Sequence, residues 1–121
     1  MIKSIKTRAI TGEGRVKRVT AFQQRVYEAV TRIPRGCVST YGLVARQIGC
    51  AAPRAVGQAL KMNPYAPKVP CHRVVSSRFQ IGGFQGATAG AAVQRKLDLL
   101  EEEGVRFEAG RLVDRHRVFE F

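Results

Sequence analysis

The chain has 121 residues, 45% of them hydrophobic, and its 21 lysines and arginines outnumber nine acidic residues to give a net charge of +12. This length suits one domain with one hydrophobic core and is too short for two. No apolar run approaches the roughly 18 residues that a membrane-spanning helix needs, and the basic N-terminus lacks the apolar stretch of a signal peptide. We therefore expect a cytoplasmic protein, nucleoid-associated in a prokaryote, with no membrane partner.

The charge is unevenly distributed along the chain. Residues 1–19 have a net charge of +5, and residues 20–97 hold eleven basic residues against one acidic residue, Glu28. Residues 98–121 hold seven acidic and four basic residues. Clustering of one sign costs self-repulsion, so we favour a nucleic-acid partner over a merely soluble basic surface.

The first half of the chain predicts an arm followed by three helices. Residues 1–19 show no periodicity and are expected to form a loose or edge-strand arm before a domain at 20–121. Thr20 can cap a first helix, whose inward stripe would be Phe22, Val26, Val30 and Ile33. Ser39 or Thr40 can cap a second helix that ends at Gly49, and Pro53 suits the first turn of a third. The last two helices predict a helix-turn-helix.

The second half predicts loops, one more helix and short strands. Three prolines, Pro64, Pro67 and Pro70, indicate a stiff, extended approach to Cys71, and Val74–Val75 suit a strand. The glycine-rich segment after Ile81 reads as a loop. Val93, Leu97 and Leu100 mark a final helix with Glu103 in its last turn, and a hairpin is expected around Ala109–Gly110. The predicted fold class is mainly α, with short strands near the Cys71 loop and the C-terminus.

Cys71 is the thiol with informative neighbours. Three scattered cysteines argue against disulfides, and the absence of a Cys/His cluster argues against a metal site. Most cysteines are buried small hydrophobes, which is the interpretation we give Cys37 and Cys50. The neighbouring His72 and Arg73 favour a lowered thiol pKa and a nucleophilic role for Cys71. In an extended segment, however, the side chains of Cys71 and His72 would point opposite ways.

The motif PCHRVV resembles the active-site signature of the O6-alkylguanine-DNA alkyltransferases. The segments IPRGCVSTYGLVARQIG, RAVGQALKMNP, GGFQG and LLEEEGVRF occur in that family's order and spacing, so the resemblance covers roughly residues 21–107. It implies transfer of an alkyl group from guanine in double-stranded DNA to the protein's own cysteine, with no cofactor, in a monomer. The family also has a separate N-terminal domain, and we expect only residues 1–19 to stand in its place.

The resemblance implies a role for each matching residue. Cys71 matches the alkyl acceptor, His72 the histidine that activates it through a water, Glu103 the carboxylate that orients the histidine, and Asn63 the hinge asparagine. Their alternative interpretations are ordinary ones: a solvated acid for Glu103 and a helix-ending residue for Asn63.

Other matches concern DNA and the base pocket. Arg54 would fill the gap left by an extruded base, since the thiol cannot reach a guanine substituent inside a duplex. The slim third helix, with Ala55 and Gly57, suits the narrow minor groove, and Thr40 and Tyr41 would also contact DNA. The base pocket would be lined by the residues Tyr41, Val74, Phe84 and Gln85.

The sequence departs from the family pattern in the closing loop. Phe84 and Gln85 replace a tyrosine and a serine, which removes a hydroxyl that could assist the leaving oxygen. Two other functions stay open: an alkyltransferase-like protein that binds alkylated bases without transfer, and a DNA-binding regulator. The alkyltransferase-like proteins carry tryptophan at the position of Cys71, so the cysteine favours chemistry.

Overall fold

The computed structural model describes residues 8–10, 16–83 and 90–121. The described helices are α1 (Ala21–Thr31), α2 (Tyr41–Gln47), α3 (Pro53–Lys61) and α4 (Ala91–Glu102), with 3-10 turns η1 (Cys71–Arg73) and η2 (Arg115–Arg117). Three two-stranded sheets pair β1 (Arg8–Ile10) with β2 (Val16–Arg18), β3 (Ser39–Thr40) with β4 (Val74–Val75), and β5 (Phe107–Glu108) with β6 (Arg111–Leu112). The mainly helical fold class is confirmed. None of the helices described is long and apolar enough to cross a bilayer.

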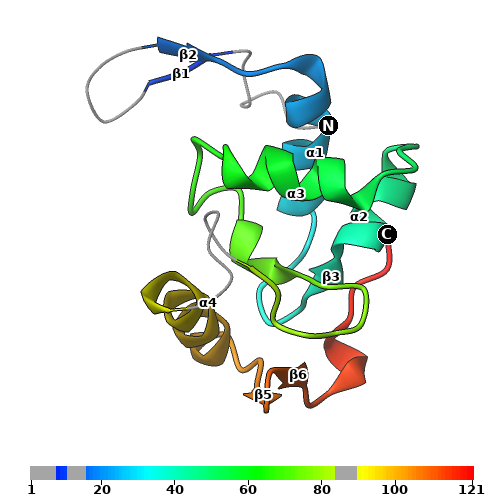
Figure 1. Ribbon diagram of the computed structural model, residues 1–121, viewed down its shortest axis with the longest axis vertical. Helices are drawn as coiled ribbons and strands as arrows, with labels where there is room; N and C mark the ends of the chain where they lie inside the picture. Colours follow the sequence, from blue (N-terminus) through cyan, green and yellow to red (C-terminus); the bar gives the residue numbers. More distant parts are fainter. Residues whose placement is uncertain (1–7, 11–15, 84–89) are drawn as a thin grey trace.

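Helices α1, α2 and α3 pack together in one half of the molecule, and α4 and the β5–β6 hairpin form the other half (Figure 1). Thr20 caps α1 as predicted: its hydroxyl accepts from Gln23 N, and the Gln23 side chain accepts from Thr20 N, both at 3.0 Å. Val26 and Val30 on the inner face of α1 are fully buried. Burying a valine stabilises the fold by roughly 1.5 kcal/mol or more, so this stripe fixes how α1 lies on its neighbours.

Helices α2 and α3 form the predicted helix-turn-helix. Thr40 caps α2 by accepting from Leu43 N at 3.0 Å, and Gly49 follows the helix with φ +70°, a conformation that favours glycine. Pro53 occupies the first turn of α3. A backbone N–H at this position would have no hydrogen-bond partner within the helix, so proline is tolerated there. The Tyr27 hydroxyl donates to the Ala59 carbonyl at 2.7 Å and joins α1 to α3.

The second half of the molecule is assembled from distant segments. Strand β3 pairs in parallel with β4, with Ser39 opposite Val74. The hairpin turn lies where the sequence predicts it, with Ala109 and Gly110 both at positive φ, as a tight two-residue hairpin requires. The C-terminal segment then returns to lie beside the start of β3, because Val118 bridges Val38.

One sequence-based expectation is wrong. The approach to Cys71 is a series of turns, and Cys71 begins η1 instead of lying in an extended segment. Backbone bonds such as Val69 N to Tyr65 O, at 3.2 Å, close these turns. Helix α4 forms where Val93, Leu97 and Leu100 predict a final helix, but its most buried side chains include a lysine. Lys96 is fully buried, whereas Val93 and Leu97 are only half-buried.

Candidate active site

Asn63 organises the loop that carries Cys71. It lies just beyond the end of α3, where its Nδ2 donates to Val69 O at 3.0 Å and its Oδ1 accepts from Tyr65 N at 2.9 Å. Its side chain also hydrogen-bonds Cys71. One amide therefore spans the turn from the helix to the thiol, and it fixes the thiol relative to α3.

Cys71 is half-buried and packs against the core that α1, α2 and α3 share. Burial raises the pKa of its thiol, while the hydrogen bond from Asn63 and the positive charge of Lys96 act in the opposite direction. Adjacency to His72 in sequence had suggested that the pKa would be lowered. In the folded chain the cost of burying a charged sulfur exceeds the stabilisation from the groups that donate hydrogen bonds to it. Ionisation of Cys71 therefore needs a proton acceptor.

Such an acceptor lies in the next residue of η1. His72 is buried, and its Nε2 lies 2.8 Å from Oε2 of Glu103, the residue that follows α4. Burial by itself raises the pKa of Glu103, but hydrogen bonds from Arg73 and His72 outweigh it and lower that pKa to about 2. Glu103 is thus an ionised carboxylate, and His72 Nε2 must carry the hydrogen that joins them. Burial lowers the pKa of His72 against the pull of Glu103, so the ring is neutral and Nδ1 is left as an acceptor.

Lys96 joins the active-site turn to the segment before the closing loop. Its Nζ donates to three backbone carbonyls, those of Val74 at 2.8 Å, Ile81 at 2.6 Å and Gly83 at 3.0 Å. Burial lowers the pKa of Lys96 to about 7, and a negative charge on Cys71 opposes that shift. The Val74 carbonyl, which the resemblance assigns to the base pocket, is therefore already one acceptor of this ammonium group.

The Tyr41 ring lies beside Gly57 of α3. Burial raises the pKa of its hydroxyl, with a further increase from the negative charge of Cys71, and the hydroxyl lies 3.5 Å from the Gly83 carbonyl. A groove of about 350 Å³ opens beside this ring, and its lining consists of the residues Tyr41, Pro53, Arg54, Gly57, Gln58, Ser76 and Ser77. Strand pairing explains the groove, because β3 leads into Tyr41 and the parallel β4 leads into Ser76.

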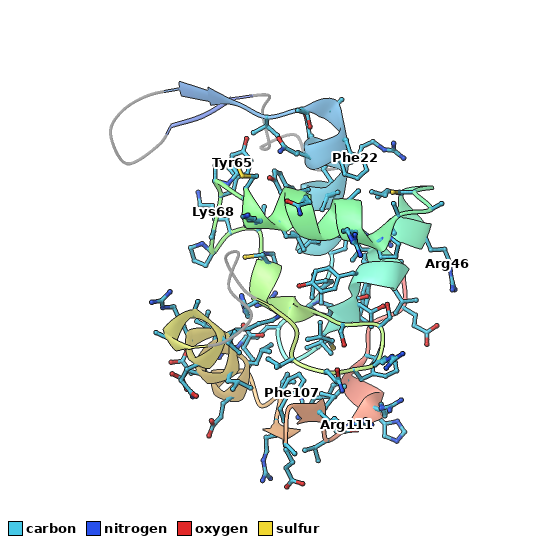
Figure 2. The ribbon with its side chains drawn as sticks, viewed as in Figure 1. Phe22, Arg46, Tyr65, Lys68, Phe107 and Arg111 are labelled. Carbon is cyan, nitrogen blue, oxygen red and sulfur yellow. The ribbon has the colours of Figure 1, made fainter. Side chains whose placement is uncertain are left out.

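The exposed face of the helix-turn-helix is basic. Arg46, Arg54 and Lys61 are exposed on α2 and α3, which have no acidic residue. Figure 2 places Arg46 and Lys68 on the half that holds α3, and Phe107 and Arg111 on the hairpin half. The exposed acids Asp98, Glu101 and Glu102 lie on α4. The charge asymmetry seen along the sequence is thus also an asymmetry in space.

The predicted site residues divide into four groups. The structure brings Asn63 to Cys71 and His72 to Glu103, and it places Tyr41, Arg54 and Gly57 around the groove. Ala55 is half-buried on α3, and Thr40 is buried with its hydroxyl committed to the α2 cap. Phe84 and Gln85 lie outside the described residues.

Two residues of the site were not predicted from the sequence. Arg73 bonds both oxygens of Glu103, and Lys96 holds the loop carbonyls. A lysine three residues after Val93 and four before Leu100 lies on the apolar face of α4, and this spacing was the available signal. Arg73 gave no comparable signal, because its partners Ile33 and Glu103 are distant in sequence.

Known proteins share much of this sequence. The family profile described as the DNA binding domain of 6-O-methylguanine DNA methyltransferase matches residues 21–105. A methylated-DNA–protein-cysteine methyltransferase of Methanothermobacter thermautotrophicus is 44% identical over 74% of this chain and 47% of that protein. The chain therefore spans about half the length of that methyltransferase. Alkyltransferase-like protein 1 of Schizosaccharomyces pombe is 46% identical over 73% of this chain and 80% of that protein.

Solved structures also match. A Mycobacterium tuberculosis OGT in complex with DNA has a TM-score of 0.64 and 46% identity, over 71% of this chain and 51% of that one. The S. pombe Atl1 in complex with damaged DNA containing O6-carboxymethylguanine has a TM-score of 0.73 and 38% identity, over 87% of this chain and all of that one.

Proposed function

Because this chain belongs to the 6-O-methylguanine DNA methyltransferase family, we propose that it repairs DNA by moving an alkyl group from the O6 atom of guanine to Cys71. The transfer is single and irreversible, since the protein itself is the acceptor. The observation that carries the proposal is the chain of contacts from Asn63 to Cys71 and from His72 to Glu103. A nucleophile, a neutral imidazole and an orienting carboxylate are the parts that thiol activation needs.

The proposed step starts with loss of the Cys71 proton. His72 accepts it at Nδ1 through a bridging water, while Nε2 stays bonded to Glu103. The sulfur then attacks the alkyl carbon as the carbon–oxygen bond breaks, and the electron pair stays on the guanine oxygen. Protonation restores guanine, and a thioether remains on Cys71. The ammonium of Lys96 stabilises the negative sulfur before the attack.

Access to the base requires that it leave the duplex. The basic face of α2 and α3 would lie along the phosphates, with α3 in the minor groove. Arg54 stands at the start of α3 on the rim of the groove that Tyr41 lines, where it can replace the extruded base in the stack. The groove then admits the nucleotide toward Cys71.

A stoichiometric conversion assay tests this proposal. The protein is mixed with a duplex that contains one O6-methylguanine, and the DNA is then digested and its nucleosides are counted. We expect one guanine restored per protein chain and then no further reaction, whereas Cys71→Ala binds the duplex and restores none. Turnover beyond one equivalent, or an unchanged lesion with the Cys71 protein, contradicts the proposal.

A second function is favoured by one observation. The whole of the S. pombe Atl1 chain is covered by this chain, at the higher of the two TM-scores given above. A protein that binds the alkylated base and transfers nothing would use the same basic face and the same groove. Tight, lesion-dependent binding without conversion in the assay above would assign this function.

A further inference from the structure

The Glu103 carboxylate has more partners than orienting a histidine requires. Arg73 donates from Nε to Oε1 at 2.9 Å and from its second terminal nitrogen to Oε2 at 3.0 Å. Its other terminal nitrogen donates to the Ile33 carbonyl at 2.9 Å. The exposed fractions of the Arg73 and Glu103 side chains are 16% and 5%. This is a buried, two-point pair that connects η1 to the end of α1 and the end of α4.

The two parallel bonds fix the plane of the carboxylate. Arginine bonds both oxygens of a carboxylate in one geometry, which a single donor cannot impose. With Arg73 in this position, Oε2 points at His72 Nε2 at 2.8 Å, and Gly36 N approaches Oε1 at 3.4 Å. The carboxylate cannot rotate without breaking the pair, so the imidazole keeps one orientation and one tautomer.

The charge of Arg73 acts beside its geometry: burial is the largest cause of the lowered pKa of His72, and the positive charge of Arg73 acts in the same direction. A buried imidazole beside a lone carboxylate would tend to take a second proton, and an imidazolium has no lone pair left for the Cys71 proton. The charged groups that face His72 are Glu103 and Lys96 from the α4 segment and Arg73 from its own turn. Arg35, after α1, lies 3.9 Å from Glu103 Oε2, but its side chain is 67% exposed. Its charge is therefore screened by water.

We infer that Arg73 is a positioning residue: it holds both oxygens of Glu103 toward His72 and keeps the imidazole neutral and able to accept a proton. The inference deepens the proposed transfer and rests on it for its functional meaning. The contacts are made between residues of this chain. They can therefore be tested whether or not the chain transfers an alkyl group.

The chain has two histidines, His72 and His116, so their ring signals can be followed by NMR as pH is varied. The exposed His116 serves as an internal reference. Arg73→Gln removes the charge and the two-point pair, Arg73→Lys keeps the charge alone, and Arg35→Gln is the matched control at the exposed arginine. We expect the His72 midpoint to rise by about one pH unit or more in Arg73→Gln, by less in Arg73→Lys, and not at all in Arg35→Gln.

An unchanged His72 midpoint in folded Arg73→Gln overturns the inference. If that variant does not fold, Arg73→Lys decides, and an unchanged midpoint there has the same meaning. Alkyl transfer is the second measurement. At about pH 6.5 we expect Arg73→Gln to react about two- to fivefold slower than the original chain, with recovery at higher pH as His72 loses its extra proton. A shifted midpoint in a chain that never transfers would contradict only the proposed function.

Discussion

The two halves of the molecule are held together by different forces. The half with α1, α2 and α3 shares one apolar cluster, in which Val26, Val30, Val44 and Val56 are fully buried. The half with α4 and the hairpin has a smaller apolar cluster around Leu100. Buried charges, Lys96 and the Arg73–Glu103 pair, join this half to the rest. The comparison teaches that the scaffold rests on packing, whereas the candidate site rests on polar contacts between distant segments.

The largest change is expected at Lys96. Lys96→Met keeps the length of the side chain but leaves three buried carbonyls without a donor, and each unsatisfied acceptor costs roughly 1–3 kcal/mol. Burial of the ammonium lowers its pKa to about 7 and so opposes folding, which offsets part of that cost. We expect the free energy of unfolding, measured in urea, to fall by about 4 kcal/mol at neutral pH. The exposed Lys68→Met is the matched control and should change it by less than about 0.5 kcal/mol. Equal effects in the two variants would contradict the structural role of the buried ammonium.

Glu103 allows the stabilising effect of the polar contacts to be tested as a function of pH. Its pKa is lowered from 4.5 to about 2 in the folded chain, so its ionisation stabilises the fold fully above about pH 4.5. That contribution is lost as pH falls toward 2. A shift of this size corresponds to about 3 kcal/mol. We expect Glu103→Gln to be less stable by about that amount near pH 6, and the two unfolding curves to converge near pH 2. A difference that is constant with pH would contradict this account.

Val56→Ala tests the packed half. Val56 is fully buried on α3, and removal of two methyl groups from such a site costs about 2 kcal/mol. The exposed Gln58→Ala on the same helix is the control, with an expected change below about 0.5 kcal/mol. The His72 ring titration should be the same in both variants, because none of the polar contacts found among the described residues joins His72, Arg73 or Glu103 to α3. A shifted His72 titration midpoint in Val56→Ala would show that packing in the α1–α3 half affects the polar contacts of the candidate site.

Arg54→Ala should have the smallest effect on stability and a clear effect on repair. The side chain is exposed, so the unfolding free energy should change by less than about 0.5 kcal/mol. We expect transfer from a duplex to slow by about tenfold and transfer from a single strand to stay near normal, since only the duplex needs the base gap filled. Arg46→Ala removes the same charge from the same face. Arg46→Ala should weaken binding to the duplex and to the single strand by similar amounts.

The difference between local packing and long-range polar contacts also explains which features could be predicted from the sequence. The caps Thr20 and Thr40, the α1 stripe and the Ala109–Gly110 turn follow from residues close together in the chain, and all were predicted. The burial of Lys96 was not, because a lysine is rarely buried even at an apolar position of a helix, and its partners at 74, 81 and 83 come together only on folding. The turn at Cys71 was missed for a similar reason. Three prolines favour extension, but backbone bonds and Asn63 close the loop.

At the candidate site, the resemblance to a family predicted more residues than local sequence patterns did. It grouped Asn63, His72 and Glu103 with Cys71 across 40 positions of sequence, from 63 to 103, whereas an acid in a run of three would otherwise be assigned to solvent. It did not indicate Arg73, whose role depends on two contacts that only the folded chain displays. The roles assigned to Phe84 and Gln85 stay predictions.

The most direct test of the central claim is peptide mapping by mass spectrometry after reaction with an O6-methylguanine duplex. The chain has three free and half-buried cysteines, Cys37, Cys50 and Cys71, so two thiols in the same molecule act as controls. The account predicts one added methyl group, located on Cys71 alone, because Cys71 is the thiol joined to Asn63 and next to His72. Methyl groups on Cys37 or Cys50, or none on Cys71 while the lesion is bound, would contradict it.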